Sequence, residues 1–145
     1  MRVSTINTTG EALMRQRVTE KAEDEFGQKL AEKREAVDIK QKLKNLLERI
    51  DVQAERLSNN MNIAELKEYK RLVQEFLHIV TKNSYRFEKQ QFLDSRGRYR
   101  VFSIVKKVNE HLDSLTKEIL RKEKSRIDIL SRLDDIRGLL LNVVV

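Results

Sequence analysis

The sequence predicts an all-α protein that folds as an antiparallel up-and-down helical bundle. Apolar residues recur at alternating three- and four-residue steps along three long stretches, and the 145 residues include no proline. Apolar residues at this spacing lie on one face of a helix, and without proline nothing forces a helix to kink or stop. The apolar faces must then pack together to leave water.

The composition limits the class of protein. A chain of 145 residues has the usual size of one domain. Charged residues make up 37% of the chain, against roughly 25% in ordinary soluble domains. Such a surface is typical of a long, thin bundle, and it also fits a thermophilic source, because ion-pair networks cost less desolvation free energy at high temperature. The absence of cysteine excludes disulfides, thiolate metal sites and cysteine nucleophiles.

The sequence predicts a cytoplasmic protein with no membrane insertion. The first residues contain no apolar run long enough for a signal peptide. No later stretch approaches the eighteen or so apolar residues that a membrane-spanning helix needs.

Residues 1–20 mix Ser, Thr, Asn and Gly without a sustained period, which predicts a disordered or loosely attached arm. Residues 21–145 are expected to form one helical-bundle domain. Its first helix should run from about Glu20 to Leu57. Gly27 weakens the first turns and the pattern is clearest after Ala36. The apolar face of this helix comprises Phe26, Leu30, Val37, Ile39, Leu43, Leu46, Leu47, Ile50, Ala54 and Leu57.

Residues 58–62 read Ser-Asn-Asn-Met-Asn, and their side chains compete for backbone hydrogen bonds. Asn62 followed three residues later by Glu65 resembles a capping box, so a tight turn and a second helix are expected here. Its apolar positions follow strict three- and four-residue steps at Leu66, Tyr69, Val73, Phe76 and Val80. The same pattern can be continued as far as Phe87. Because the connection is short, the first two helices should be antiparallel neighbours.

Residues 90–100 contain Gly97 among alternating apolar and basic residues, which predicts a loop or a short hairpin. From Val101 the helical period returns up to Ile119, and it resumes from Ile127 through Leu130, Leu133, Ile136 and Leu140. Residues 121–126 between these stripes are entirely polar. The two stripes are in phase, so one long helix would give a three-helix bundle, whereas a break near Ser125 would give four helices.

The stretch from Gly97 to Asn142 resembles the YaaR family of small bacterial proteins. The resemblance extends over about residues 40–142, and its most specific part is the ending Ile136-Arg137-Gly138-Leu139-Leu140. The chain departs from the family pattern with Asn109 in place of a frequent Asp and with Arg137 in place of a frequent Gln. The resemblance implies a four-helix up-and-down bundle, which favours a break near Ser125. It implies no catalytic residue, because the family has no assigned activity.

No constellation of side chains points to catalysis, to a metal or to a cofactor. Glu75 and His78 have the Glu-x-x-His spacing of di-iron bundles, but the motif occurs once and both residues should face solvent. His111 beside Glu110 is isolated and is expected to be a hydrogen-bonded surface group. The sequence also lacks a nucleophile elbow and a phosphate-binding loop. We therefore expect no enzymatic activity.

The positive charge is concentrated in residues 82–107, which hold eight basic and two acidic residues, a local charge of +6. The segment also holds five of the eight aromatic residues, a combination that suits phosphates and unpaired bases. In the alternative, Phe87, Phe92 and Phe102 close the end of the bundle and the cations stay solvated. The candidate residues for binding a partner or an anion are Arg96, Arg98, Tyr99, Arg100, Lys106 and Lys107.

The C-terminal segment from Gly138 is apolar on every side, so part of it should stay uncovered in a monomer. This suggests a homodimer or a docked partner; the alternative is burial in the bundle with a frayed valine tail. The candidate self-association residues are Leu139, Leu141, Val143 and Val144.

The sequence thus predicts a non-enzymatic helical module that binds another protein or itself. The alternative function is nucleic-acid binding through residues 82–107. A third hypothesis is binding of an acidic small molecule or of an anionic lipid surface by the same basic segment.

Overall fold

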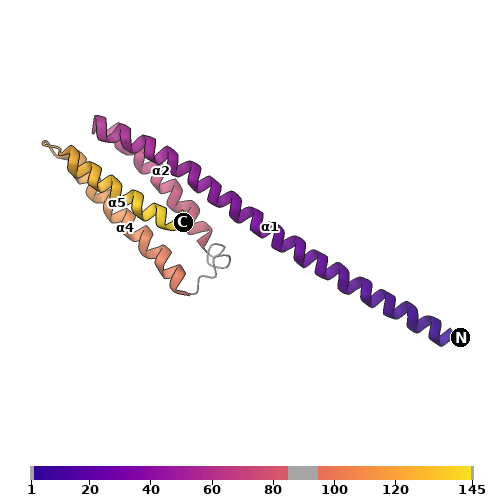
Figure 1. Ribbon diagram of the computed structural model, residues 1–145. Helices are drawn as coiled ribbons and strands as arrows, with labels where there is room; N and C mark the ends of the chain where they lie inside the picture. The colour runs from indigo at the N-terminus through magenta and orange to yellow at the C-terminus, as the bar shows by residue number, and fades with distance from the viewer. Residues whose placement is uncertain (1, 85–94, 145) are drawn as a thin grey trace. The chain divides into compact units, whose positions relative to one another are not determined.

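The computed structural model describes the backbone of residues 2–84 and 95–144, with side chains for residues 17–84 and 100–144. This part of the chain contains four helices and no strand: α1 (Arg2–Asn60), α2 (Ile63–Lys82), α4 (Ser95–Leu120) and α5 (Arg126–Val144) (Figure 1). The predicted all-α, four-helix architecture is confirmed. The alternative of one continuous helix over residues 101–142 is wrong, because the chain leaves helical geometry between Arg121 and Ser125.

The chain divides into two compact units, residues 1–37 and 38–145. Residues 2–20 are helical and belong to α1, which also continues through Gly27. A proline-free segment can join a helix despite its polar composition. That the arm is loosely attached, and that a domain begins at residue 21, stay predictions.

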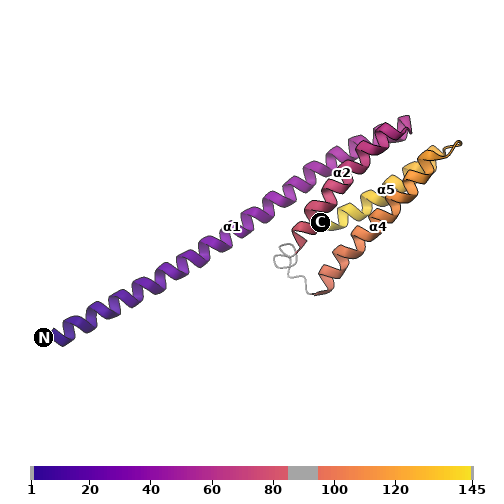
Figure 2. The same ribbon diagram turned by 180° about the vertical axis from the view of Figure 1, so that it is seen from behind.

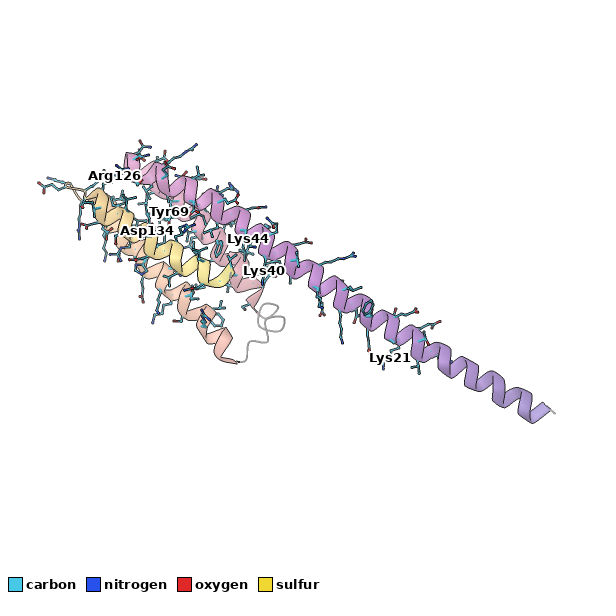
Figure 3. All side chains as sticks on the ribbon, viewed as in Figure 1. Lys21, Lys40, Lys44, Tyr69, Arg126 and Asp134 are labelled. Carbon is cyan, nitrogen blue, oxygen red and sulfur yellow. The ribbon has the colours of Figure 1, made fainter. Side chains whose placement is uncertain are left out.

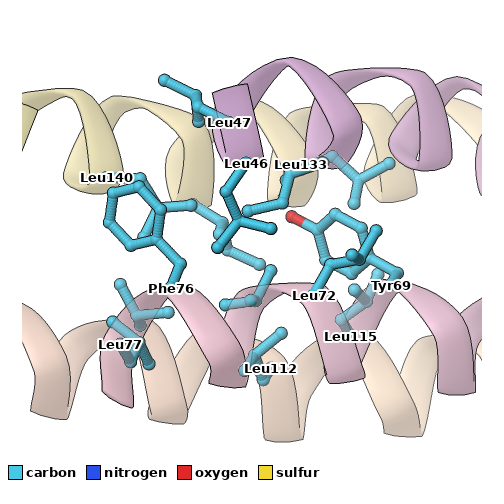
Figure 4. Close-up of a cluster of buried hydrophobic side chains, with 14 of the residues drawn as sticks. Leu46, Leu47, Tyr69, Leu72, Phe76, Leu77, Leu112, Leu115, Leu133 and Leu140 are labelled. Carbon is cyan, nitrogen blue, oxygen red and sulfur yellow. The ribbon is translucent and has the colours of Figure 1, made fainter. Parts of the chain in front are cut away.

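The core lies in the unit of residues 38–145 and draws on all four helices. Figure 4 shows aliphatic side chains interleaved around the rings of Tyr69 and Phe76. Among the described side chains, those that are least accessible are Leu43, Ile50, Leu57, Tyr69, Val73, Phe76, Val80, Val108, Leu112, Leu115, Ile119, Ile129, Ile136 and Leu140. Their three- and four-residue spacing is the pattern read from the sequence, so the apolar period does build the bundle.

Polar contacts between helices show that α2 runs antiparallel to α4 and that α1 runs antiparallel to α5. Lys70 of α2 donates to Thr116 of α4, and Gln74, one turn further along α2, donates to Asn109, which lies earlier in α4. Arg126 and Arg137 of α5 bind Asn59 and Asp51 of α1 in the same reversed order. In both views of the ribbon α4 and α5 lie side by side (Figures 1 and 2).

The apolar face of α5 differs from the predicted one. Ile127 is 78% exposed and Leu130 is 39% exposed, whereas Ile129 is 1% exposed. The face that packs into the core follows Ile129, Leu133, Ile136 and Leu140. Because the helix is interrupted at residues 121–125, α5 is free to turn about its own axis. The phase relation with Ile119 therefore no longer decides which side is buried.

The loop predicted for residues 90–100 is wrong where the structure describes it. α4 begins at Ser95, so residues 95–100 are helical and Gly97 lies inside the first turns. A single glycine costs a helix about 1 kcal/mol, which the following apolar period outweighs. The remaining residues of that prediction, 90–94, lie outside the described part of the chain.

The turn between α1 and α2 is built by Met61 and Asn62. Met61 has a φ of 48°, the left-handed conformation that commonly ends a helix, and its amide donates to the Leu57 carbonyl at 2.7 Å. The Asn62 side chain then accepts from the Glu65 amide at 2.8 Å, which caps α2. The Glu65 carboxylate accepts from the Gln53 amide at 2.6 Å, so Glu65 joins α2 to α1 instead of closing a capping box.

Replacing Asn62 by alanine should lower the free energy of unfolding by about 1 kcal/mol, because the Glu65 amide loses its acceptor at the start of α2. The Asn62→Asp variant, which keeps an acceptor oxygen, should unfold close to the parent. Urea unfolding followed by circular dichroism would measure both. Equal loss in the two variants would show that the cap contributes nothing.

Candidate interaction surfaces

The first 37 residues carry an apolar face that the described chain leaves open to solvent. Val18, Phe26, Leu30 and Val37 of α1 have exposed fractions of 69%, 65%, 42% and 65%. With successive residues about 100° apart, these four side chains fall within an arc of about 120° around the helix. A phenylalanine and three aliphatic side chains gathered on one face differ from apolar residues scattered singly, and they form a candidate docking surface. We call these four residues the α1 apolar face.

The sequence pattern assigned Phe26, Leu30 and Val37 to the buried side of the first helix, and it missed Val18. The period is real, but these three side chains are exposed. The difference in helix length is the feature that separates these exposed residues from the core: α1 has 59 residues, whereas α2, which the tight turn joins to it, has 20. A helix of 20 residues covers only about as many residues of its neighbour.

The predicted basic site is described only in part. The side chains of Arg96, Arg98 and Tyr99 lie outside the described residues. Arg100, Lys106 and Lys107 are exposed on α4, and Phe102 nearby is 48% exposed. Phe102 therefore does not close the end of the core, in contrast to one of the two readings of this segment. Binding of a partner or an anion by these residues stays a prediction.

The C-terminal apolar residues are largely covered by their own chain. Val143 and Val144 are buried in the core, and Leu139 and Leu141 are half-buried against it. α5 extends to Val144, so Val143 and Val144 are helical, whereas Val145 lies outside the described residues. The uncovered apolar surface expected at this end is therefore small, and self-association through these four residues stays a prediction.

Glu75 and His78 lie toward solvent, as their helical positions predicted. His78 is exposed, and the Glu75 carboxylate accepts from Arg71 at 3.5 Å. Arg71 also binds Glu68 at 2.6 Å, and this hydrogen bond holds the pKa of Glu68 below its usual value. Among the described residues no group of three His, Cys, Asp or Glu side chains is placed to hold a metal ion.

His111 belongs to a polar cluster between α4 and α5. Arg132 of α5 donates to His111 Nδ1 at 2.8 Å and to Glu118 Oε1 at 2.9 Å from Nη2. The Glu118 side chain is only 14% exposed, and its Oε2 is buried without a partner. Because arginine has no acceptor, Nδ1 of His111 carries no proton in this arrangement. The cluster joins two helices, and a hollow of about 180 Å³ beside it is lined by Glu118 and Arg132 among others.

Two further hollows, each lined in part by α1 and α2, lie between the helices of the second unit. One has a volume of about 270 Å³ and is lined by Asp51, Tyr69, Arg126, Asp134 and Arg137 among others; Figure 3 labels three of these side chains. The other, of about 420 Å³, is bordered by Glu48, Arg49, Arg56 and Glu68. The first hollow is lined by three acidic and two basic side chains and the second by two of each, so both present charges of either sign to a ligand.

Tyr69 is a buried phenol, 1% exposed, beside the hollow of about 270 Å³. Burial raises its pKa well above the usual value, and the negative charge of Asp51 raises it further. Unfolding exposes the phenol, which then ionises near its ordinary pKa of about 10. A raised pKa in the folded state means that stability is fully present below about pH 10 and falls as the pH rises above it.

Stability should therefore drop between about pH 10 and 12, and Tyr69→Phe should remove most of that drop. Urea midpoints measured across this range for the parent and the variant would test the expectation. An equal alkaline slope in both proteins would contradict it.

No helix in the described part of the chain is both long and apolar enough to cross a membrane.

Comparison with known proteins places the chain in a family. The model of a family described as "Protein of unknown function (DUF327)" matches residues 3–144. The chain is 33% identical over 101 residues to the uncharacterized protein YaaR of Bacillus subtilis (strain 168), a match that covers 70% of this chain and 69% of YaaR. The resemblance to the YaaR family read from the sequence is thereby confirmed.

Two solved structures share the fold. The crystal structure of the uncharacterized protein BH1478 from Bacillus halodurans superposes with a TM-score of 0.74 at 35% identity, over 81% of this chain and 96% of that one. A designed granulopoietic protein obtained by topological rescaffolding, Moevan, superposes with a TM-score of 0.67 at 33% identity, over 74% and 92% of the two chains.

Proposed function

Because the chain belongs to the DUF327 family, whose function is unknown, its relatives supply no activity, and we propose from its own residues that it is a non-enzymatic helical protein–protein interaction module. The α1 apolar face carries this proposal. Its four exposed apolar side chains lie on one helix face and have no covering element within the described chain. Covering such a face removes apolar surface from water, which is the main driving force of protein association.

The other surfaces support the proposal indirectly. His111 is bound to Arg132, Glu75 is bound to Arg71, and the hollows along α1 and α2 are lined by side chains of both charges. None of these arrangements brings an acid, a base or a nucleophile to a shared reacting atom, which general acid–base or nucleophilic catalysis requires.

A photo-crosslinking amino acid placed on the α1 apolar face tests the proposal in living cells. Ala22 lies within the arc of the face, one turn from Phe26, whereas Gln28 lies on the opposite side of the same helix. A crosslinker at Ala22 should give covalent protein adducts, whether with a second copy or with another protein, and one at Gln28 should give few. The adducts at Ala22 should disappear when Phe26 and Leu30 are replaced by glutamate.

The matched pair of positions makes the outcome decisive. Equal adducts at Ala22 and Gln28, or adducts at Ala22 that survive the double glutamate variant, would contradict the proposal.

Nucleic-acid binding is separated from this proposal by its salt dependence. Arg100, Lys106 and Lys107 are exposed, and contacts of such cations with phosphates weaken steeply as salt is added, whereas apolar contacts do not. Oligonucleotide binding at low salt that is lost on neutralising these three residues would favour the nucleic-acid alternative.

A further inference from the structure

We propose that the α1 apolar face binds a second copy of this chain, antiparallel and around a two-fold axis near residue 28. This inference rests on the proposed function and names the partner. The first observation that supports it is the spacing of the exposed apolar residues. The midpoint of Phe26 and Leu30 is residue 28, and the midpoint of Val18 and Val37 is 27.5.

This near-symmetry has a direct consequence for two helices that run in opposite directions. With the axis at residue 28, Phe26 meets Leu30 of the partner subunit, and Leu30 meets Phe26 of the partner subunit. Val18 and Val37 meet at both ends in the same way. A two-fold contact of this kind is self-complementary, so all four exposed apolar side chains of each copy are covered at once.

The charges beside the face support the same arrangement. Relative to Phe26, Glu23 and Arg34 lie about 60° and 80° to one side, whereas Lys29 and Glu25 lie about 60° and 100° to the other. All four residues are exposed. In antiparallel helices each flank faces its own counterpart. Glu23 therefore approaches Arg34 of the partner subunit, and Glu25 approaches Lys29 of the partner subunit.

A parallel, in-register pair would reverse this pattern. The flank that carries Glu23 and Arg34 would then face the flank that carries Glu25 and Lys29, so that Arg34 would approach Lys29 of the partner subunit, a contact of like charges. Charges on the flanks of paired helices determine their orientation in this way. The residues thus favour the antiparallel arrangement over the parallel one.

The experiment is a charge exchange between two variants of the full chain. Glu23→Arg and Arg34→Glu each create like-charge contacts in an antiparallel homodimer, so each variant alone should run as a monomer of 17.2 kDa in sedimentation equilibrium. The parent should approach twice that mass, 34.4 kDa, at high concentration. An equimolar mixture of the two variants should recover the dimer, because both flank contacts then join opposite charges.

The distance between nitroxide labels on the two copies tests whether the paired helices run antiparallel or parallel. The chain has no cysteine, so Arg17→Cys gives one labelled site. Residue 17 lies 11 residues from the axis. Two labels are therefore offset along the helix axes by about 33 Å in an antiparallel pair, at 1.5 Å per residue, and have no such offset in a parallel pair.

Three results would overturn the inference. These are a parent that stays monomeric at high concentration, a variant mixture that fails to dimerise while the parent does, and a distance between labels at position 17 that is below the offset of about 33 Å. Adducts from position 22 with a different protein, together with a monomeric parent, would overturn the self-pairing alone and leave the proposed function standing. Loss of the adducts altogether would remove both.

Discussion

Replacing Phe76 by alanine should reduce the free energy of unfolding by about 3–5 kcal/mol, the largest effect expected of any single substitution in this chain. The Phe76 ring is 0% exposed and lies among side chains from the other helices of the bundle (Figure 4). Truncation removes the ring from a close-packed interior and leaves a cavity that rigid helices cannot close. A domain of this size has only about 5–15 kcal/mol of stability, so much of it would be lost.

Phe102→Ala is the matched control, because Phe102 is 48% exposed and lies on α4. The same chemical change there should cost about 1 kcal/mol or less, since little packing is removed. Urea midpoints of the two variants would measure the contrast. Equal losses would contradict the assignment of Phe76 to the core and of Phe102 to the surface.

The second large effect is expected at the contact of α4 with α5. Arg132→Leu removes the cation beside Glu118, whose side chain is 14% exposed and whose Oε2 already has no partner. His111 Nδ1 loses its donor in the same variant. We expect a loss of about 2–3 kcal/mol. This is less than the roughly 3–5 kcal/mol for a fully buried pair, because Arg132 keeps 28% of its exposure to water.

The double variant Glu118→Leu with Arg132→Leu shows whether the stability loss of Arg132→Leu comes from the lost contact or from the buried, unpaired carboxylate of Glu118. Replacing both members of such a pair with apolar residues is often close to neutral, because the desolvation cost disappears together with the attraction. The double variant should therefore recover to within about 1 kcal/mol of the parent. If the double variant is as unstable as Arg132→Leu, the unpaired carboxylate of Glu118 is not the cause of the stability loss.

The fold follows from the sequence wherever burial repeats with the helical period. Leu66, Tyr69, Val73, Phe76 and Val80 keep that period without interruption, and all of them are buried. The polar residues at 121–126 left one helix or two open, the resemblance to the YaaR family favoured a break near Ser125, and the structure has a break there. The period does not fix the rotation of α5 after that interruption, so the sequence pattern placed Ile127 and Leu130 in the core in place of Ile129.

The α1 apolar face was harder to predict from the sequence than the core, for a physical reason. A helical apolar stripe has the same appearance in the sequence whether its own chain covers it or a partner does. Phe26 and Leu30 were therefore assigned to the core together with Leu43 and Ile50. Only the extent of the helices separates the two cases. The C-terminal valines show the opposite case. Part of this run was expected to stay uncovered because it is apolar on every side, whereas α5 buries Val143 and Val144 in the core.

At one end of the bundle, hydrogen bonds join the connection between α1 and α2 to the connection between α4 and α5, which is remote in sequence. Lys124 donates to the Met61 carbonyl at 2.8 Å, and Arg126 donates to Asn59 at 2.9 Å. The peptide from Arg121 to Ser125 is exposed and rich in trypsin sites. A single proteolytic nick there would therefore leave α5 held in place by its burial and by these bonds. The molecule is thus suited to fragment complementation, with α5 supplied as a separate peptide.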